Sequence, residues 1–154
     1  MIRFRILALL AALAGTAGAA AQDRSAEPAD ACVRLDKDIG PAFERGLETT
    51  LALPGSCTWS LDGGQGKVTV ELRIDRLASE TEARKLMHFA RLEPAEGLPK
   101  LGDGGLYRTK DGELFIDAIK DRRHFRFTVR AADMHDRLLR QSLQFAGVTV
   151  NGRF

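Results

Sequence analysis

The sequence predicts a single α+β domain with one antiparallel sheet of about five strands and helices packed on it. Two adjacent segments, 113–120 and 124–130, have strand periodicity and are joined by a tight turn. A second strand-like pair, 57–61 and 67–75, is joined by a glycine-rich loop. Helical periodicity precedes, separates and follows these pairs. This order is typical of one antiparallel sheet covered by helices, not of alternating parallel-strand units.

The N-terminal 21 residues have the pattern of a secretory signal peptide. Arg3 and Arg5 form a short basic region, residues 6–14 are apolar, and residues 19–21 are small. The apolar run is short for a membrane span, so we expect no stable membrane insertion of the mature chain. The expected location is therefore periplasmic or secreted.

Residues 22–31 are polar and lack periodicity, which is typical of a flexible lead-in. The folded domain is then expected to cover residues 32–154. Its charge is balanced: two of the chain's 23 basic residues lie in the predicted signal peptide, which leaves 21 against 21 acidic residues. A neutral chain lacks the basic footprint that nucleic-acid binding requires, so we expect no nucleic-acid partner.

Cys32 and Cys57 are the only cysteines. In an exported protein an even pair predicts a disulfide. A redox pair or a metal pair is the alternative. The long spacing is unlike a Cys-x-x-Cys redox motif, and a zinc site would need more companion ligands, so we predict neither metal nor cofactor.

The first half of the domain contains one unclear stretch. The apolar positions Leu35, Ile39, Phe43 and Leu47 have helical spacing, but Gly40-Pro41 interrupts them. Because proline fits best in the first turn of a helix, the helix is expected to start near Gly40. Residues 50–54 match no single pattern.

The middle of the domain has clearer signals. Residues 67–75 alternate as in a half-buried strand. Ser79 and Glu82 have capping-box spacing and predict a helix with an apolar face that ends before Pro94. Residues 94–105 read as a loop, and a further strand is expected at 106–109, joined by an Asp111-Gly112 turn to segment 113–120.

Segment 113–120 is apolar on both faces, which predicts a central strand. Asp117 interrupts it. A buried carboxylate must be paired or have a raised pKa. The interpretation we favour is a half-solvated face on which Asp117 pairs with Arg126 or another neighbour. After segment 124–130, Asp133 is expected to cap a last helix that stops at Gly147, and residues 148–154 are expected to form a short strand or a loose tail.

Three features resemble a known family. They are Cys32, the Cys57-x-Trp59 pattern, and the segment Leu98-Pro-Lys-Leu-Gly-Asp103. The chain resembles a family of small exported bacterial proteins of unknown function, many of them lipoproteins, with a Cys…Cys-x-Trp pattern and a Leu-Gly-Asp loop. The resemblance implies a PsbP-like fold and supports the disulfide. The family has no established catalytic residues. This chain lacks the lipobox cysteine and has Gly104-Gly105 where an acidic residue and alanine are more usual.

No catalytic motif stands out in the sequence. The chain has no Gly-x-Ser-x-Gly, and its histidines, His88, His124 and His135, are not spaced as metal ligands. Each is expected at the surface. We therefore predict no catalytic residues.

The function hypothesis is an exported, non-enzymatic module that binds another protein or a cell-envelope component. The candidate surfaces are a basic stripe of Arg126, Arg130 and Arg73 on the sheet, and a loop region that includes Asp103 and Tyr107. An alternative is a hydrolase of cell-wall polymer, or an inhibitor of one, in which the histidines converge with acids. A weaker alternative is a small-ligand carrier with an apolar pocket between helices and sheet.

Overall fold

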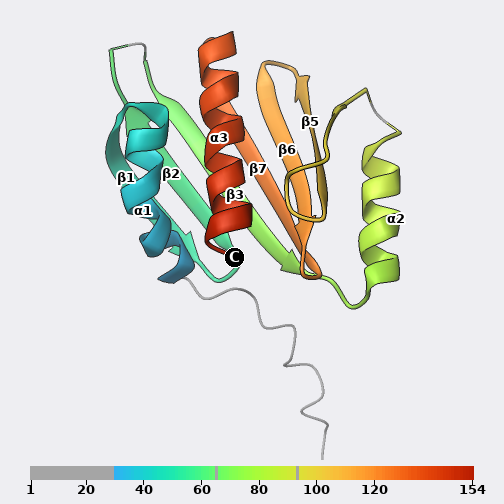
Figure 1. The fold of residues 1–154 in the computed structure, drawn as a ribbon. Coiled ribbons are helices and arrows are strands. Elements are labelled where there is room, and N and C mark those ends of the chain that lie inside the picture. Colours follow the sequence, from blue (N-terminus) through green and yellow to red (C-terminus); the bar gives the residue numbers. More distant parts are fainter. Residues whose placement is uncertain (1–29, 65, 93) are drawn as a thin grey trace, which may run out of the picture.

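The computed structural model describes residues 30–64, 66–92 and 94–154. They form a seven-stranded antiparallel sheet and three helices, so the α+β class and the single antiparallel sheet are confirmed. The predicted signal peptide lies outside the described residues, as does the lead-in up to residue 29. The elements in chain order are α1 (Asp30–Phe43), β1 (Gly46–Leu53), β2 (Ser56–Asp62), β3 (Val68–Arg76), α2 (Glu80–Ala90), β4 (Glu96–Leu98), β5 (Gly104–Lys110), β6 (Glu113–Lys120), β7 (Arg123–Ala131) and α3 (Asp136–Gly152) (Figure 1).

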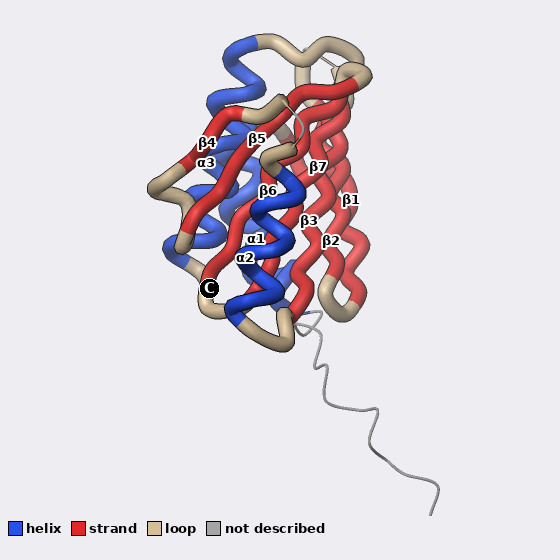
Figure 2. The backbone as a smooth tube through the Cα atoms, turned by 90° about the vertical axis from the view of Figure 1, so that its right-hand side faces the viewer, coloured by secondary structure: helices blue, strands red, loops and turns tan. Residues whose placement is uncertain are grey.

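The strands follow the order β1-β2-β3-β7-β6-β5-β4. Helices α1 and α3 lie side by side over one face of the sheet (Figures 1 and 2). The main core lies beneath them and is organised around Phe145 of α3. Its ring meets Phe43, Trp59 and Phe127 edge-on, at centroid distances of 5.8, 5.8 and 6.1 Å. On the opposite face, α2 packs over Leu106 of β5 and Ile119 of β6.

The central hairpin is as the sequence predicts. On β6, Leu114, Ile116 and Ala118 join the main core, while Ile119 packs on the opposite face with α2. The turn into β7 places Asp121 and Arg122 at φ angles of 50° and 59°, in the left-handed region that suits the twist of a two-residue hairpin. The sheet is therefore buried on both faces at β6.

The count of about five strands is wrong, because β1 and β4 are additional strands. The sequence pattern predicts a helix as far as residue 47 and no clear element at residues 50–54. The chain leaves α1 at Phe43, Glu44 adopts a φ of 53°, and the Arg45 amide donates to the Gly40 carbonyl. The chain then pairs along β2, and the β4 segment pairs with β5. Both are edge strands whose conformation depends on backbone pairing with a neighbour, not on their own periodicity.

The expected helix start near Gly40 is also wrong. Helix α1 begins at Asp30, two residues before the expected domain boundary, and contains Pro41 in its last turn. Proline there removes only one backbone hydrogen bond, near the helix end. Burial of Leu35, Ile39 and Phe43, each at most 1% exposed, stabilises the helix through that point.

The expected stop of the last helix at Gly147 is wrong as well. Helix α3 runs to Gly152, and its cap is His135 rather than Asp133: His135 Nδ1 accepts from the Leu138 amide at 3.2 Å. Residues beyond Gly147 stay helical because Val150 is fully buried against the core. None of the helices in the described part of the chain is long and apolar enough to cross a membrane.

The predicted disulfide is confirmed. Cys32 and Cys57 are bonded, with their Cα atoms 5.4 Å apart, and both are buried. The bond joins the start of α1 to β2. Structural disulfides of this kind are typical of oxidising compartments outside the cytoplasm.

Candidate functional site

Helix α2 begins with the predicted cap. The Glu82 amide donates to Ser79 Oγ at 3.1 Å, and the Glu82 carboxylate accepts from the Ala78 amide at 2.6 Å. The Glu82 side chain thus reaches one residue further back than a capping box requires. Ala83 and Met87 form the buried side of the helix, over Leu106 of β5 and Ile119 of β6.

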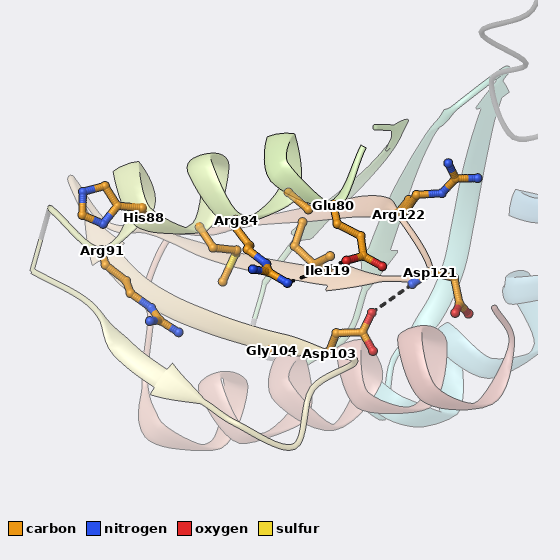
Figure 3. A pocket seen from close by; sticks show the side chains of 11 residues that line it. Glu80, Arg84, His88, Arg91, Asp103, Gly104, Ile119, Asp121 and Arg122 are labelled. Atoms are coloured by element: carbon orange, nitrogen blue, oxygen red, sulfur yellow. Dashed lines mark hydrogen bonds and ion pairs between the residues drawn. The ribbon is translucent and has the colours of Figure 1, made fainter. Parts of the chain in front are cut away.

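A groove with a volume of about 720 Å³ runs between α2 and the strand ends. Its floor is apolar and consists of Ala83 and Met87 from α2 and Ile119 from β6. Figure 3 shows α2 on one side of the strands and α3 on the other, so this groove is separate from the main core. A floor of this kind offers apolar surface to a ligand without opening the core to water.

One wall of the groove is the loop before β5. The Asp103 amide donates to the Ile119 carbonyl at 2.7 Å, and the Asp103 carboxylate accepts from the Asp121 amide at 3.1 Å. Gly102 has a φ of 60°, and a Cβ there would lie 2.3 Å from the Ile119 carbonyl oxygen. Only glycine fits this close approach. The Leu-Gly-Asp segment, which forms this wall, is therefore bonded to the end of β6 and to the β6–β7 turn.

The same loop is held from the other side of the sheet by the end of α3. The Asn151 side chain accepts from the Gly102 amide at 2.8 Å and donates to the Lys100 carbonyl at 3.0 Å. Lys120 Nζ donates to the Val150 carbonyl at 3.0 Å. These bonds fix the wall before any ligand arrives, so little ordering entropy is lost on binding.

The two ends of the groove carry opposite charge. Glu80, Asp103 and Asp121 place three carboxylates where α2 begins (Figure 3). Arg84 lies midway along the groove with its guanidinium directed at Glu80, and Arg91 lies at the other end (Figure 3). Arg84 and Glu80 lie 3.7 Å apart and are 84% and 80% exposed, so their ion pair is weak and both groups are accessible to a ligand.

His88 and Arg122 complete the rim. His88 lies beside Arg91 at the end of α2, and both side chains are exposed. Arg122 lies at the acidic end, but its side chain extends away from the three carboxylates there (Figure 3). The groove is therefore basic at one end and acidic at the other, with an apolar floor between them.

The arginines of the predicted basic stripe lie together on the open sheet face, and each is paired. Arg126 Nε donates to Asp117 at 2.9 Å. Arg130 binds Glu113 at 2.7 Å and Glu71 at 3.1 Å. Those two carboxylates raise the pKa of the Arg130 guanidinium through hydrogen bonding. Arg73 lies 3.1 Å from Asp75. The stripe thus carries matching acids along its length.

The predicted pairing of Asp117 with Arg126 is confirmed, but the expected half-solvated surroundings are wrong: Asp117 is 0% exposed. His124 Nε2 lies 2.8 Å from its carboxylate, and Arg108 lies 3.5 Å away. Burial by itself would raise the pKa of Asp117. Hydrogen bonds from His124 and Arg126 outweigh that effect and hold the pKa below its ordinary value.

Tyr107 lies on the other face of the sheet, where it packs against the main core. Its hydroxyl donates to the Glu96 carboxylate, and this hydrogen bond raises the pKa of Tyr107. The five residues predicted for a binding surface are thus divided among three places. Of these five, Asp103 alone lines the groove.

The histidines have three different surroundings. His88 is exposed at the groove, whereas His124 is only 4% exposed and contacts Asp117, so its expected surface position is wrong. His135 caps α3. Among the described residues, no group of three or more His, Cys, Asp or Glu side chains is arranged to hold a metal ion.

The sequence reasoning missed most of the groove. Glu80, Arg84, His88 and Arg91 recur at helical spacing, so they share one flank of α2. That spacing was the available signal. It does not show which loop the flank faces, and Asp121 of the β6–β7 turn joins the groove from a distant part of the sequence.

Comparisons with family models, curated proteins and solved structures found no match to this chain.

Proposed function

We propose that this protein is an exported binding module and that its ligand is an extended peptide segment of a partner protein, held in the groove beside α2. The observation that carries the proposal is the groove itself: an apolar floor between oppositely charged ends. Its volume of about 720 Å³ is of the size of a ligand-binding cleft. Charged groups at both ends of an apolar strip favour a ligand that is itself apolar in the middle and charged at its ends.

The charges fix the direction of this ligand. Acidic side chains of the peptide pair with Arg91 at one end and with Arg84 midway along the groove, and basic side chains pair with Glu80 and Asp121 at the other end. Its apolar residues lie over Met87 and Ile119. A rigid wall at Asp103 and a capped helix hold these groups in place before binding, which favours recognition of an extended chain.

A displayed library of random peptides, selected on the purified full-length protein with its disulfide intact, tests the proposal. The selected sequences should contain an acidic cluster separated by apolar residues from a basic cluster. Arg84→Glu combined with Arg91→Glu should weaken binding of a selected peptide at least tenfold, equivalent to about 1.4 kcal/mol. Fluorescence anisotropy of the labelled peptide measures the Kd.

Lys85→Glu is the matched control. Lys85 is adjacent to Arg84 in α2 and exposed, but it does not line the groove, so its substitution should leave the Kd within about twofold. The proposal is wrong if no peptide is enriched, if the enriched peptides lack the charge pattern, or if both variants bind equally well.

The location outside the cytoplasm is part of the proposal. It is supported by the disulfide between Cys32 and Cys57 and by the signal-peptide pattern of residues 1–21. The resemblance to small exported bacterial proteins with a PsbP-like fold points the same way. Fractionation of cells that produce the full chain, with the disulfide state of each fraction measured, tests this part: a reduced cytoplasmic protein would contradict it.

A small-ligand carrier is the second candidate, because the cleft lies between a helix and the sheet and has an apolar floor. Native mass spectrometry of protein purified gently from an envelope fraction distinguishes the two candidates. A retained small molecule that is lost on Met87→Arg supports the carrier. A bare protein that selects charged peptides supports the peptide module.

A further inference from the structure

The outer edge of β1 is an unusual surface for a folded domain. The strand is eight residues long and has no neighbour on its outer side among the described residues (Figure 1). At the other end of the sheet, β4 has only three residues and lies between Pro94 and Pro99. Proteins usually protect long edge strands with charges, proline or bulges, because an open edge pairs with other chains. Such protection is present at β4 and nearly absent along β1.

The regular part of β1, Thr49–Leu53, is uncharged and exposes leucine. Leu51 and Leu53 are 57% and 52% exposed on the open sheet face, beside the uncharged residues Thr58 and Ser56 of β2. The one charged residue of β1, Glu48, lies at the bulge before this segment and pairs with Lys67 at 3.1 Å. Elsewhere on the open face ion pairs prevail, so this apolar patch is confined to the edge.

We propose that this edge binds a second copy of the same chain, by antiparallel pairing of the two β1 strands about a two-fold axis at Leu51. In this register Leu51 faces Leu51 of the second copy. Leu53 faces Thr49 of the second copy, and Ala52 faces Thr50 of the second copy. The leucines of both copies then cover one another on the same face, and every pair is uncharged.

Self-pairing follows from charge and symmetry. A two-fold axis brings each residue near its own counterpart, so a charged edge would repel itself, whereas Thr49–Leu53 meets no like charge. Val33 of α1 adds to the argument: it is 61% exposed and lies one turn before Asp36, which accepts from the Thr50 hydroxyl at 2.9 Å. An exposed apolar side chain thus lies on the flank of α1 that faces β1.

Sedimentation velocity of the full-length protein across a concentration series tests the proposal. A dimer should be populated at about 100 µM, where even micromolar affinity gives mostly dimer. Leu51→Lys brings two ammonium groups face to face and should weaken dimerisation at least tenfold. Leu92→Lys is the matched control, because Leu92 is 68% exposed outside the sheet, and it should leave the dimer unchanged.

Cysteine cross-linking tests the register. Directly opposed residues have Cα atoms roughly 5 Å apart, within disulfide range, so Leu51→Cys should give a covalent dimer on mild oxidation. Leu47→Cys should not, because the two copies of residue 47 would be eight positions apart along the strands, roughly 26 Å. A protein that stays monomeric, a dimer that tolerates Leu51→Lys, or a cross-link at 47 rather than 51 would each overturn the proposal.

Discussion

The carboxylate of Asp117 is fully buried and lies against basic side chains from two neighbouring strands. His124 and Arg126 are 2.8 and 2.9 Å away, and Arg108 is 3.5 Å away. Asp117→Asn keeps the shape of the side chain and removes its charge. The guanidinium groups then lie beside a neutral amide. Removal of one partner from a buried ion pair lowers the free energy of unfolding by about 3 to 5 kcal/mol. Because the Arg126 side chain is 45% exposed, we expect Asp117→Asn to cost the lower value, about 3 kcal/mol.

Urea denaturation measures this loss through the fluorescence of Trp59, the only tryptophan, which is completely buried. Glu113→Gln is the matched control. It lies on the same strand and face as Asp117, but its partner Arg130 is half exposed, so the loss should stay below about 1 kcal/mol. Equal slopes of the two denaturation curves would show that the denatured states are comparable.

The effect of Asp117 should also depend on pH. Because its pKa is lowered in the folded protein, Asp117 contributes stability above the pKa it has in the unfolded chain. That contribution is lost as the pH falls through the lowered pKa of the folded state. The difference in stability between the native protein and Asp117→Asn should therefore shrink in acid. A loss from Asp117→Asn no larger than that from Glu113→Gln, or a difference that grows in acid, would refute this account.

Three further substitutions test the fold. Cys32→Ser with Cys57→Ser should lower the free energy of unfolding by about 3.5 kcal/mol, from a loop closed over 25 residues; an equally stable variant would contradict this. Gly147→Ala should raise thermal stability by about 1 kcal/mol because the residue is inside α3 and a Cβ there meets nothing within 4 Å; a loss would mean that the helix ends there. Gly102→Ala should lower the thermal stability by at least about 2 kcal/mol, measured as a lower thermal midpoint. An unchanged midpoint would exclude the close contact with Ile119.

The strongest local patterns were sufficient for the central elements of the fold. The alternation in β3 and β7 and the two-sided apolar run of β6 predicted a half-buried and a central strand, because a strand places alternate residues on opposite faces wherever it lies. The turn at Asp121-Arg122 and the cap at Ser79 were also predicted. These features depend on the backbone conformations and hydrogen bonds of a few adjacent residues.

The site was less accessible to sequence reasoning. The helical spacing of Arg84 and Arg91 indicates that they share one flank of α2. Asp103 was singled out by the Leu-Gly-Asp segment. The groove also needs Asp103 and Asp121, which come from separate parts of the chain and meet through the hydrogen bond from the Asp121 amide to the Asp103 carboxylate. No periodicity encodes that contact. The expectation that the arginines of the sheet form a basic stripe likewise omitted their partners, Asp117, Glu113 and Glu71, whose positions depend on strand register.

The sequence by itself determined the α+β class, the disulfide and the burial of β6, because each follows from residue type and short-range spacing. Only the tertiary structure decided that Gly46–Leu53 is a strand, that Gly147 lies inside a helix, and that Asp117 is buried with a lowered pKa. In each case the deciding interaction comes from a distant part of the chain: β2 pairs with β1, the core covers Val150, and β7 supplies His124 and Arg126. Local propensity is weak beside such contacts, and they form only when the whole sheet assembles.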